Sequence, residues 1–246
     1  MVINVEIDLR QGNCLELMKN ISDKSVDLIL CDLPYGTTAC KWDTIIPFDK
    51  LLEQYNRIIK DNGAIILTAA QPFTSALIMS NIKNFRYCWY WEKDYGVGFM
   101  NAKKMPLKKI EDICIFYKKL PVYNPQGLKR IDKKITMKKR TATSVFGNMG
   151  VNKNHNKEYI QEFTNYPDNL LRFKTEKGLH PTQKPVALFE YLIKTYTNEG
   201  DLVLDNCAGS GTTGVACKNL KRNFILMELE EEYCKIARTR LSQDRL

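Results

Sequence analysis

The sequence predicts an α/β fold in which helices cover a doubly wound, mostly parallel sheet, and three observations lead to this prediction. Short apolar, β-branched runs alternate with segments of helical periodicity along most of the 246 residues. The run 26–31 is apolar almost throughout, as is typical of a parallel strand buried on both faces. Further along, a strand at 201–204 leads through a glycine-rich turn into a helix at 211–220, which is the local order of elements in a doubly wound sheet.

The elements before residue 120 follow from local patterns. The segment 48–60 is amphipathic, and Asn62-Gly63 after it is a C-cap signal that should end the helix. The segments 85–91 and 112–117 are rich in aromatic and β-branched residues, which favour strands. In order, we expect a strand at 2–9, a helix at 14–20, a strand at 26–31, a helix at 48–60, a strand at 64–68, a helix at 72–81, and strands at 85–91 and 112–117.

Between residues 120 and 178 the apolar periodicity fades. This segment holds twelve Lys and Arg against five Asp and Glu, so it carries seven of the nine excess positive charges of the chain. Concentrated positive charge favours a polyanionic partner such as nucleic acid. A lysine-rich surface insertion without such a partner is the alternative.

The α/β pattern resumes after the basic segment. A helix at 185–196 begins with Pro185, whose missing N–H does no harm in a first helical turn. A strand at 201–204, a helix at 211–220, a strand at 223–229 and a helix at 230–241 follow. We therefore expect that 1–119 and 179–246 form one domain, interrupted by an insertion at 120–178.

The composition excludes several classes of protein. The eight cysteines form no Cys-x-x-Cys pair and there are only two histidines, so we expect no metal site. Cysteines inside apolar runs suit a reducing compartment. The first twelve residues do not read as a signal peptide, and no apolar stretch approaches the roughly 18 residues of a membrane span. We expect a soluble, cytoplasmic protein with no membrane partner.

The glycine-rich turn at 205–214 points to a nucleoside-containing cofactor. Glycines let a ligand approach the backbone, and the N-terminus of the following helix presents free N–H groups. Glu228, after the next strand, is placed to accept hydrogen bonds from ribose hydroxyls. The turn also satisfies Gly-x-Gly-x-x-Gly, which NAD enzymes use, but the chain offers no evident hydride-transfer residues. A purely structural tight turn is a further alternative.

The turn at 32–36 follows the buried strand 26–31 directly, so it lies at the carboxyl edge of the sheet, where α/β proteins bind ligands. Pro34 stiffens the turn, Tyr35 offers a flat aromatic face and Asp32 offers a hydrogen-bond acceptor. These groups suit an extruded base, which needs a stacking surface and a grip on its amine. An ordinary surface turn has a similar composition.

Taken together, the two turns resemble those of the β group of DNA amino-methyltransferases, in which Asp-Pro-Pro-Tyr precedes Asp-Pro-Phe-x-Gly-Ser-Gly-Thr-Thr. This chain has Asp32-Leu33-Pro34-Tyr35 and then Asp205-Asn206-Cys207-Ala208-Gly209-Ser210-Gly211-Thr212-Thr213. His180-Pro181-Thr182-Gln183-Lys184-Pro185 and Gly12-Asn13-Cys14-Leu15 resemble two further family segments, beside the methionine and adenine parts of the cofactor. The resemblance covers about 5–119 and 179–241.

The resemblance implies a circularly permuted, Rossmann-like methyltransferase sheet that uses S-adenosyl-L-methionine. Residues 1–119 would be its catalytic half, 120–178 a target-recognition insertion and 179–246 its cofactor-binding half. The implied cofactor-binding residues are Asn13, Asp32, His180, Thr182, Lys184, Asp205, Cys207, Gly209, Ser210, Gly211, Thr212, Thr213 and Glu228.

Three positions depart from the family signatures. Leu33 replaces a proline but keeps the backbone carbonyl through which that position acts. Asn206-Cys207 replaces Pro-Phe and removes a ring that packs beside the cofactor's adenine in the family. Asn13 replaces an acid, although its amide still forms hydrogen bonds.

The implied reaction is methylation of an adenine amine in double-stranded DNA by base flipping, with Asp32, Leu33, Pro34 and Tyr35 as catalytic residues. The Asp32 carboxylate and the Leu33 carbonyl would accept the two amine hydrogens, while Tyr35 would stack on the base. The alternatives are cytosine-N4 methylation, RNA methylation and a catalytically inactive DNA-binding relative. Whether the chain forms a homodimer stays open. This interpretation requires that the turns at 32–35 and 205–214 open into one cleft.

Overall fold

The computed structural model describes residues 5–38, 40, 43–136, 158–176, 178 and 183–243. Two compact units separate in it: unit 1 comprises Met1–Asn124 and Asn169–Leu246, and unit 2 comprises Pro125–Asp168. The limits of unit 2 lie inside the basic segment 120–178, because residues on both sides of it pack with unit 1. Among the described residues, no helix combines the length and the apolar character that crossing a membrane requires.

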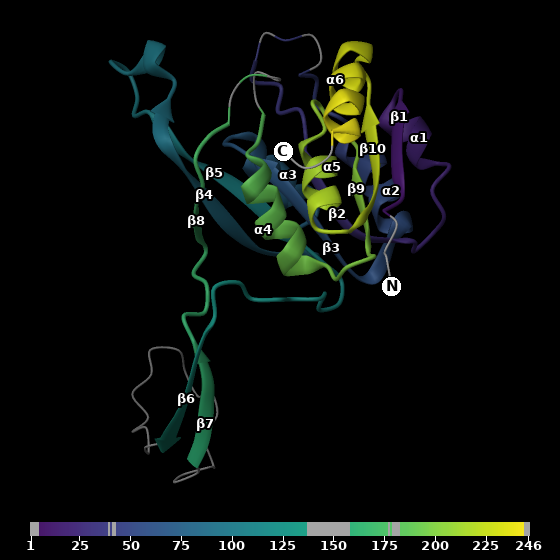
Figure 1. Ribbon diagram of the computed structural model, residues 1–246. Helices are drawn as coiled ribbons and strands as arrows, with labels where there is room; N and C mark the ends of the chain where they lie inside the picture. The colour runs from purple at the N-terminus through teal and green to yellow at the C-terminus, as the bar shows by residue number, and fades with distance from the viewer. Residues whose placement is uncertain are drawn as a thin grey trace. The chain divides into compact units, whose positions relative to one another are not determined.

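An eight-stranded sheet forms the centre of unit 1 (Figure 1). Five consecutive strands on one side of the sheet are parallel to their neighbours, and one strand further along is antiparallel to both of its neighbours. This arrangement confirms the predicted doubly wound, mostly parallel α/β fold. The spatial order is β1 (Ile7–Gln11), β10 (Asn223–Glu228), β9 (Leu202–Asp205), β2 (Val26–Asp32), β3 (Ile59–Ala69), β5 (Lys108–Phe116), β4 (Phe85–Val97) and β8 (Leu170–Arg172).

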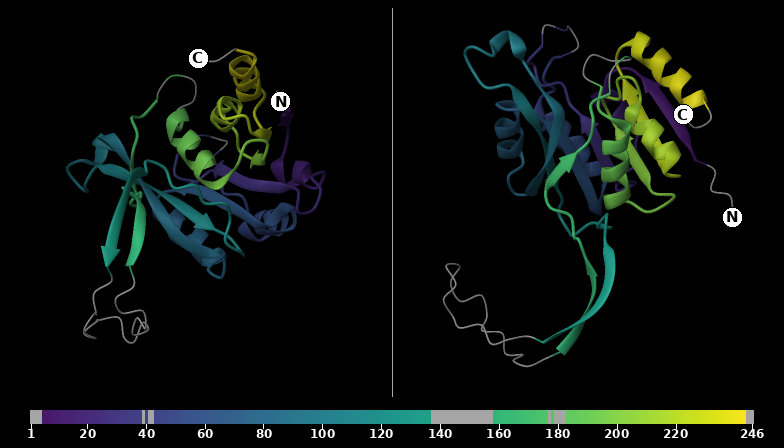
Figure 2. Two further views of the ribbon diagram at one scale, coloured as in Figure 1. Left: turned by 60° about the horizontal axis from the view of Figure 1, so that its bottom comes forward. Right: turned by 60° about the vertical axis from the view of Figure 1, so that its left-hand side comes forward.

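Helices cover both faces of this sheet (Figure 2). Alternate residues of β2 separate the two cores: Leu28 and Leu30 pack on one side, and Ile29 and Cys31 on the other. This alternation explains why the strand reads as a continuous apolar run. The face of Leu28 is covered by α4 (Val186–Tyr196), α5 (Thr212–Asn219) and α6 (Glu231–Ser242), and the face of Ile29 by α1 (Cys14–Met18), α2 (Phe48–Ile58) and α3 (Phe73–Ser80).

The first and last strands of the chain lie side by side in the sheet. β1 pairs in parallel with β10, with Ile7 opposite Phe224, and the N–H of Gly12 donates to the carbonyl of Glu228 at 2.9 Å. The sequence order therefore differs from the spatial order, as expected for a circularly permuted sheet. One consequence is that the segment after β1 and the end of β10 share the carboxyl edge.

Unit 2 contains an antiparallel pair of strands, β6 (Lys129–Thr136) and β7 (Glu158–Thr164). The sequence patterns do not predict them. Almost all residues of β6 are exposed, so the strand carries no apolar alternation that would reveal it. The short strand β8 also escapes prediction, because three residues are too few to show a period.

The predicted C-cap at Asn62-Gly63 is wrong. Helix α2 ends at Ile58, and β3 begins at the next residue, so Gly63 lies inside the strand. Glycine is needed at this position because the side chain of Ile59 and the backbone of Asp27 lie close to its Cα atom. A Cβ atom at Gly63 would lie 2.7 Å from Cδ1 of Ile59 and 2.8 Å from the carbonyl oxygen of Asp27. The other differences are smaller: β1 begins at Ile7, with residues 2–4 outside the described part, and β4 continues to Val97.

Replacing Gly63 with alanine is expected to lower the free energy of unfolding by about 1–3 kcal/mol, because the new Cβ meets backbone that does not yield easily. Asn62→Ala is the matched control, since the Asn62 side chain is exposed and surface changes stay within about 0.5 kcal/mol. Urea unfolding followed by circular dichroism measures both. Equal midpoints for the two variants would contradict the close approach.

Candidate active site

The carboxyl ends of β1, β2, β9 and β10 open into a cleft of about 800 Å³ in unit 1. Both predicted turns line it, as the interpretation of the sequence requires. The predicted site residues along its wall are Asn13, Asp32, Leu33, Pro34, Tyr35, Lys184, Asp205, Cys207, Gly209, Ser210, Thr212 and Glu228. Gly211 and Thr213 lie behind this wall at the start of α5. His180 and Thr182 lie outside the described residues.

A buried carboxylate organises the glycine-rich turn. Asp205 accepts hydrogen bonds from the N–H of Cys207 at 3.0 Å and from the hydroxyl of Thr213. Burial raises the pKa of Asp205 to about 6, although these hydrogen bonds oppose the rise. Gly211 takes a left-handed conformation with φ of 81°, and a Cβ atom there would lie 2.9 Å from Cβ of Ala237. Glycine therefore lets the turn lie directly against α6.

Glu228, at the end of β10, lies where the sequence predicts a ribose acceptor. Its two carboxylate oxygens accept from the N–H of Gly209 at 2.7 Å and the N–H of Glu230 at 2.9 Å. Burial raises the pKa of this carboxyl group. A carboxylate has about four acceptor positions, so the backbone N–H groups leave Glu228 capacity to accept from a ligand hydroxyl. Together with the glycine turn, this cradle fits the nucleoside part of S-adenosylmethionine.

The replacement of Pro-Phe by Asn206-Cys207 is compensated locally. The buried amide oxygen of Asn206 accepts a hydrogen bond from the hydroxyl of Tyr55 on α2. Cys207 is hydrogen-bonded to Cys14, and this contact lowers the pKa of the Cys14 thiol to about 7. Both cysteines line the cleft, so thiols occupy the part of the wall where the family signature has a phenylalanine ring. The sequence gives no signal for the contact with Tyr55, because 151 residues separate the partners.

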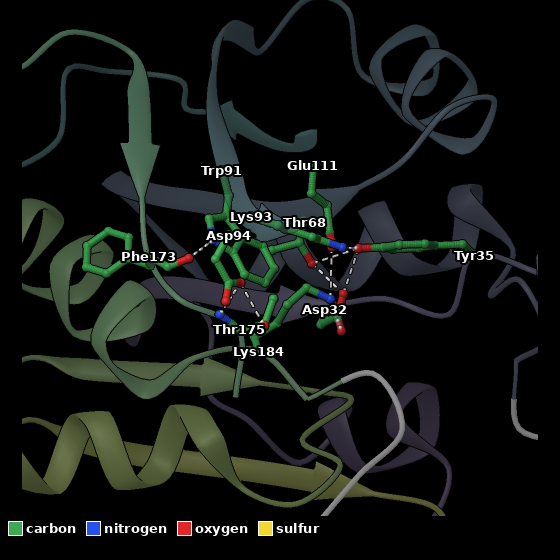
Figure 3. A network of polar contacts seen from close by, with 10 residues as sticks. All are labelled: Asp32, Tyr35, Thr68, Trp91, Lys93, Asp94, Glu111, Phe173, Thr175 and Lys184. Atoms are coloured by element: carbon green, nitrogen blue, oxygen red, sulfur yellow. Dashed lines mark hydrogen bonds and ion pairs between the residues drawn. The ribbon is translucent and has the colours of Figure 1, made fainter. Parts of the chain in front are cut away.

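Asp32 is the centre of a polar network (Figure 3). Its Oδ1 accepts from the hydroxyl of Tyr35 at 2.7 Å and from the hydroxyl of Thr68 on β3. Its Oδ2 accepts from Nζ of Lys184 at 2.6 Å. Three of about four acceptor positions are therefore used by the protein itself.

Lys184 connects Asp32 to a second carboxylate, Glu111 on β5. Its Nζ lies 2.9 Å from Oε1 of Glu111, while Nζ of Lys93 lies 2.7 Å from Oε2. Burial alone would raise the pKa of Glu111, but the two ammonium groups outweigh it and lower the pKa to about 2. Burial would likewise lower the pKa of Lys184, yet the two carboxylates raise it. Two lysines and two acidic side chains are therefore joined in one chain of ion pairs.

Tyr35 contributes its hydroxyl to this network and its ring to the cleft wall. The hydroxyl also lies 3.0 Å from Oγ1 of Thr68 and 3.1 Å from Oε1 of Glu111. Burial and the adjacent carboxylates raise the pKa of Tyr35, so the group stays a hydrogen-bond donor. Its ring packs against Phe73 with the centroids 5.1 Å apart.

The backbone after the turn at 32–36 is held by Asp43. Its carboxylate accepts from the N–H groups of Gly36 and Thr37, both at 2.9 Å, and of Thr38 at 2.6 Å. Burial opposes ionisation, but these hydrogen bonds outweigh it and lower the pKa of Asp43. The neighbouring Lys41 and Trp42 lie outside the described residues.

The sequence does not predict how this network is completed, because its further members belong to separate strands. Thr68, Lys93 and Glu111 come from β3, β4 and β5, and only the pairing of these strands brings them to Asp32 (Figure 3). The same figure shows the hydrogen bonds that join the segment 173–175 to β4. The Trp91 indole donates to the carbonyl of Phe173 at 2.8 Å, and the Thr175 hydroxyl to Asp94 at 2.8 Å.

The fold and the cleft are those of a Rossmann-like methyltransferase, and comparison with known proteins identifies the family. The family model described as DNA methylase, of the N6/N4 methyltransferase type, matches residues 26–239. The chain therefore belongs to the N6/N4 DNA methylase family.

Individual relatives agree with this assignment. The Type II methyltransferase M.HpaI of Haemophilus parainfluenzae is 29% identical over 250 residues, which cover 95% of this chain and 73% of that protein. The DNA adenine methyltransferase YhdJ of Escherichia coli (strain K12) is 30% identical over 250 residues, covering 94% and 81%. The crystal structure of an M1.HpyAVI–SAM complex has a TM-score of 0.66 at 26% identity, covering 96% and 99%. These matches confirm the expected family, fold, enzyme class and methyl donor.

Replacing Tyr55 with phenylalanine is expected to destabilise the protein by about 1–3 kcal/mol, because the buried amide of Asn206 loses its donor. It should also weaken S-adenosylmethionine binding severalfold, since Asn206 belongs to the glycine-rich turn. Tyr87→Phe is the control, because it removes a hydroxyl that binds Tyr196 away from the cleft. Calorimetric titration with the cofactor measures the affinity. An unchanged affinity in Tyr55→Phe would show that the hydrogen bond between Tyr55 and Asn206 does not support cofactor binding.

Proposed function

We propose that this DNA methylase transfers the methyl group of S-adenosylmethionine to the exocyclic amine of an adenine flipped out of double-stranded DNA. The observation that carries the proposal is the single cleft shared by Asp32 and the glycine-rich turn. The sulfonium supplies an electrophilic methyl group, so the protein has to position the amine and stabilise charge.

In this proposal the Asp32 carboxylate and the Leu33 carbonyl accept the two hydrogens of the amine. The nitrogen lone pair is thereby turned toward the methyl group and forms the new C–N bond while the C–S bond breaks, leaving its electrons on sulfur. The amine becomes positively charged, and the negative charge of Asp32 stabilises that state until the amine releases its proton to water. The side chain of Leu33 is buried, which fixes the backbone that carries the carbonyl.

Lys184 has a distinct place in this mechanism. Its ammonium group occupies Oδ2 of Asp32, where a donor from the base is needed, and Glu111 lies within reach of the same ammonium. An entering amine takes the remaining position on the Asp32 carboxylate, or displaces Lys184 toward Glu111. Glu111 thus keeps Lys184 paired in either case.

Adenine is proposed as the base because family enzymes with aspartate at this position of the turn mostly act on adenine, and because YhdJ is described as a DNA adenine methyltransferase. Cytosine-N4 methylation is the competing outcome. Nucleoside analysis of methylated DNA separates N6-methyladenine from N4-methylcytosine. Acting on DNA, the enzyme would work in the cytoplasm.

Unit 2 is proposed as a DNA-contacting element for target recognition. Strand β6 carries Lys129, Arg130, Lys133 and Lys134 with little burial. Exposed lysines of this kind pair with phosphates and supply affinity without reading sequence.

Replacing Asp32 with alanine is expected to reduce methyl transfer at least a thousandfold while S-adenosylmethionine affinity changes little, because the amine loses its charged acceptor. Incorporation of labelled methyl groups into unmethylated genomic DNA measures the first quantity, and calorimetric titration the second. Retained activity in Asp32→Ala would refute the assigned role. Wild-type protein without activity on DNA would refute the proposed function.

The double substitution Lys129→Ala, Lys133→Ala should weaken DNA binding and make the slope of log K against log salt less steep by about 2, since each phosphate contact contributes about 0.9. S-adenosylmethionine affinity should not change. The control pair is Lys83→Ala, Lys194→Ala, which alters exposed lysines of unit 1 outside the cleft. Identical salt slopes for both pairs would remove unit 2 from the interface.

A further inference from the structure

The hairpin formed by β4 and β5 projects from the edge of the sheet that carries the active site (Figures 1 and 2). Because β5 is antiparallel to both β3 and β4, β4 runs in the same direction as β2 and β3. Its carboxyl end therefore leaves the sheet on the side where Asp32 ends β2. The strand continues to Val97, a short turn of helix spans Phe99–Asn101, and β5 starts back at Lys108.

The tip of this hairpin exposes large apolar side chains. Phe99 is 80% exposed and Met100 is 94% exposed, and every residue from 101 to 110 is exposed. Met105 and Leu107 add to the same surface. Single exposed apolar residues are common, but a group of them at a projecting tip marks a contact site.

The charge of the tip indicates the kind of partner. Residues 95–110 contain four lysines and no acidic residue. Lys109 pairs with Glu92, whereas Lys103, Lys104 and Lys108 form no ion pair among the residues that the structure describes. Unpaired lysines around apolar side chains are complementary to a polyanion that also offers flat apolar surfaces. Double-stranded DNA has both, in its phosphates and its stacked bases.

The hairpin also borders the cleft. Tyr95, Val97, Lys108 and Ile110 line it, so the base of the hairpin forms part of the wall that faces Asp32. The two sides pack closely there: a Cβ atom on Gly96 would lie 2.8 Å from Cβ of Leu107. At the foot of the hairpin, Lys93 is held by Glu111. The base of the hairpin is therefore well packed, and it holds the tip beside the cleft that contains Asp32.

We propose that Phe99 and Met100 form a wedge that enters the DNA stack at the target pair and fills the space left by the flipped base. Lys103 and Lys104 then contact the flanking phosphates. Extruding a base costs a few kcal/mol of lost stacking and pairing, and apolar side chains inserted at the step offset part of it. This inference rests on the proposed function, because it requires a base that leaves the duplex.

The test compares two DNA substrates for the double variant Phe99→Ala, Met100→Ala. The methylated site is first mapped in genomic DNA modified by the wild-type protein. Oligonucleotide duplexes then present that site either fully paired or with an abasic residue opposite the target base. We expect kcat/KM on the paired duplex to fall at least tenfold, and on the abasic duplex to stay within about threefold of wild type, because the opening is already made.

Controls separate the wedge from other roles. Met79→Ala, Ile82→Ala removes exposed apolar side chains elsewhere on unit 1 and should leave both duplexes unaffected. Phe99→Leu, Met100→Leu keeps an apolar tip and should restore most of the activity on the paired duplex. S-adenosylmethionine affinity should be the same in all variants.

Three results would overturn the wedge. Unchanged activity of the alanine variant on the paired duplex would show that the tip is not used. An equal loss on both duplexes would assign the tip to general affinity. A changed sedimentation coefficient, with loss on both duplexes, would assign it to contact between copies of the chain. Each of these leaves the methyl-transfer proposal intact, whereas inactivity of the wild-type protein on DNA would end both.

Discussion

The position of Lys184 between Asp32 and Glu111 is the constraint on which the active site depends. With Lys93 these groups bring four charges together, and three of the four side chains are less than one-fifth exposed. Buried charges are stable only when each is paired, so removing Lys184 would leave Asp32 without its ion pair, and removing Glu111 would leave Lys93 without its ion pair. Because the four groups come from β2, β4, β5 and the segment before α4, their pairing fixes those elements relative to one another.

The wall of the cleft formed by the glycine-rich turn and Glu228 is also held by buried carboxylates, which form hydrogen bonds in place of ion pairs. The Asp205 carboxylate and the Glu228 carboxylate each accept backbone N–H groups of the glycine-rich turn. The turn therefore keeps its shape although its Asn206-Cys207 departs from the family signature. The hydroxyl of Tyr55 takes up the polar group that this change introduces. A substitution that looks like decay in the sequence is thus accommodated in the structure.

Sequence patterns predicted the parts of the molecule in which local chemistry decides the structure. The apolar run of β2 and the glycine turn identified the sheet, its carboxyl edge and one wall of the cleft. They did not reveal Glu111 or Thr68, since a polar residue in a strand gains a role only from the strands paired beside it. The helix C-cap predicted at Asn62-Gly63 was wrong for a related reason. Glycine is needed at position 63 because the carbonyl of Asp27 on the neighbouring strand lies close to it, and helix α2 ends earlier, at Ile58.

The direction of β5 brings the β4–β5 hairpin to the edge of the sheet at which Asp32 lies. Parallel strands are joined by crossovers that carry the chain across a face of the sheet, so they leave no hairpin at the carboxyl edge. One antiparallel strand changes this: β4 and β5 pair directly, and their connection emerges beside Asp32. The glycine-rich turn after β9, Glu228 at the end of β10, Asp32 at the end of β2 and the apolar, lysine-rich tip of the β4–β5 hairpin therefore all lie at one edge of the sheet. In the proposed reaction, a base that leaves the duplex at that tip therefore enters the same cleft that contains Asp32.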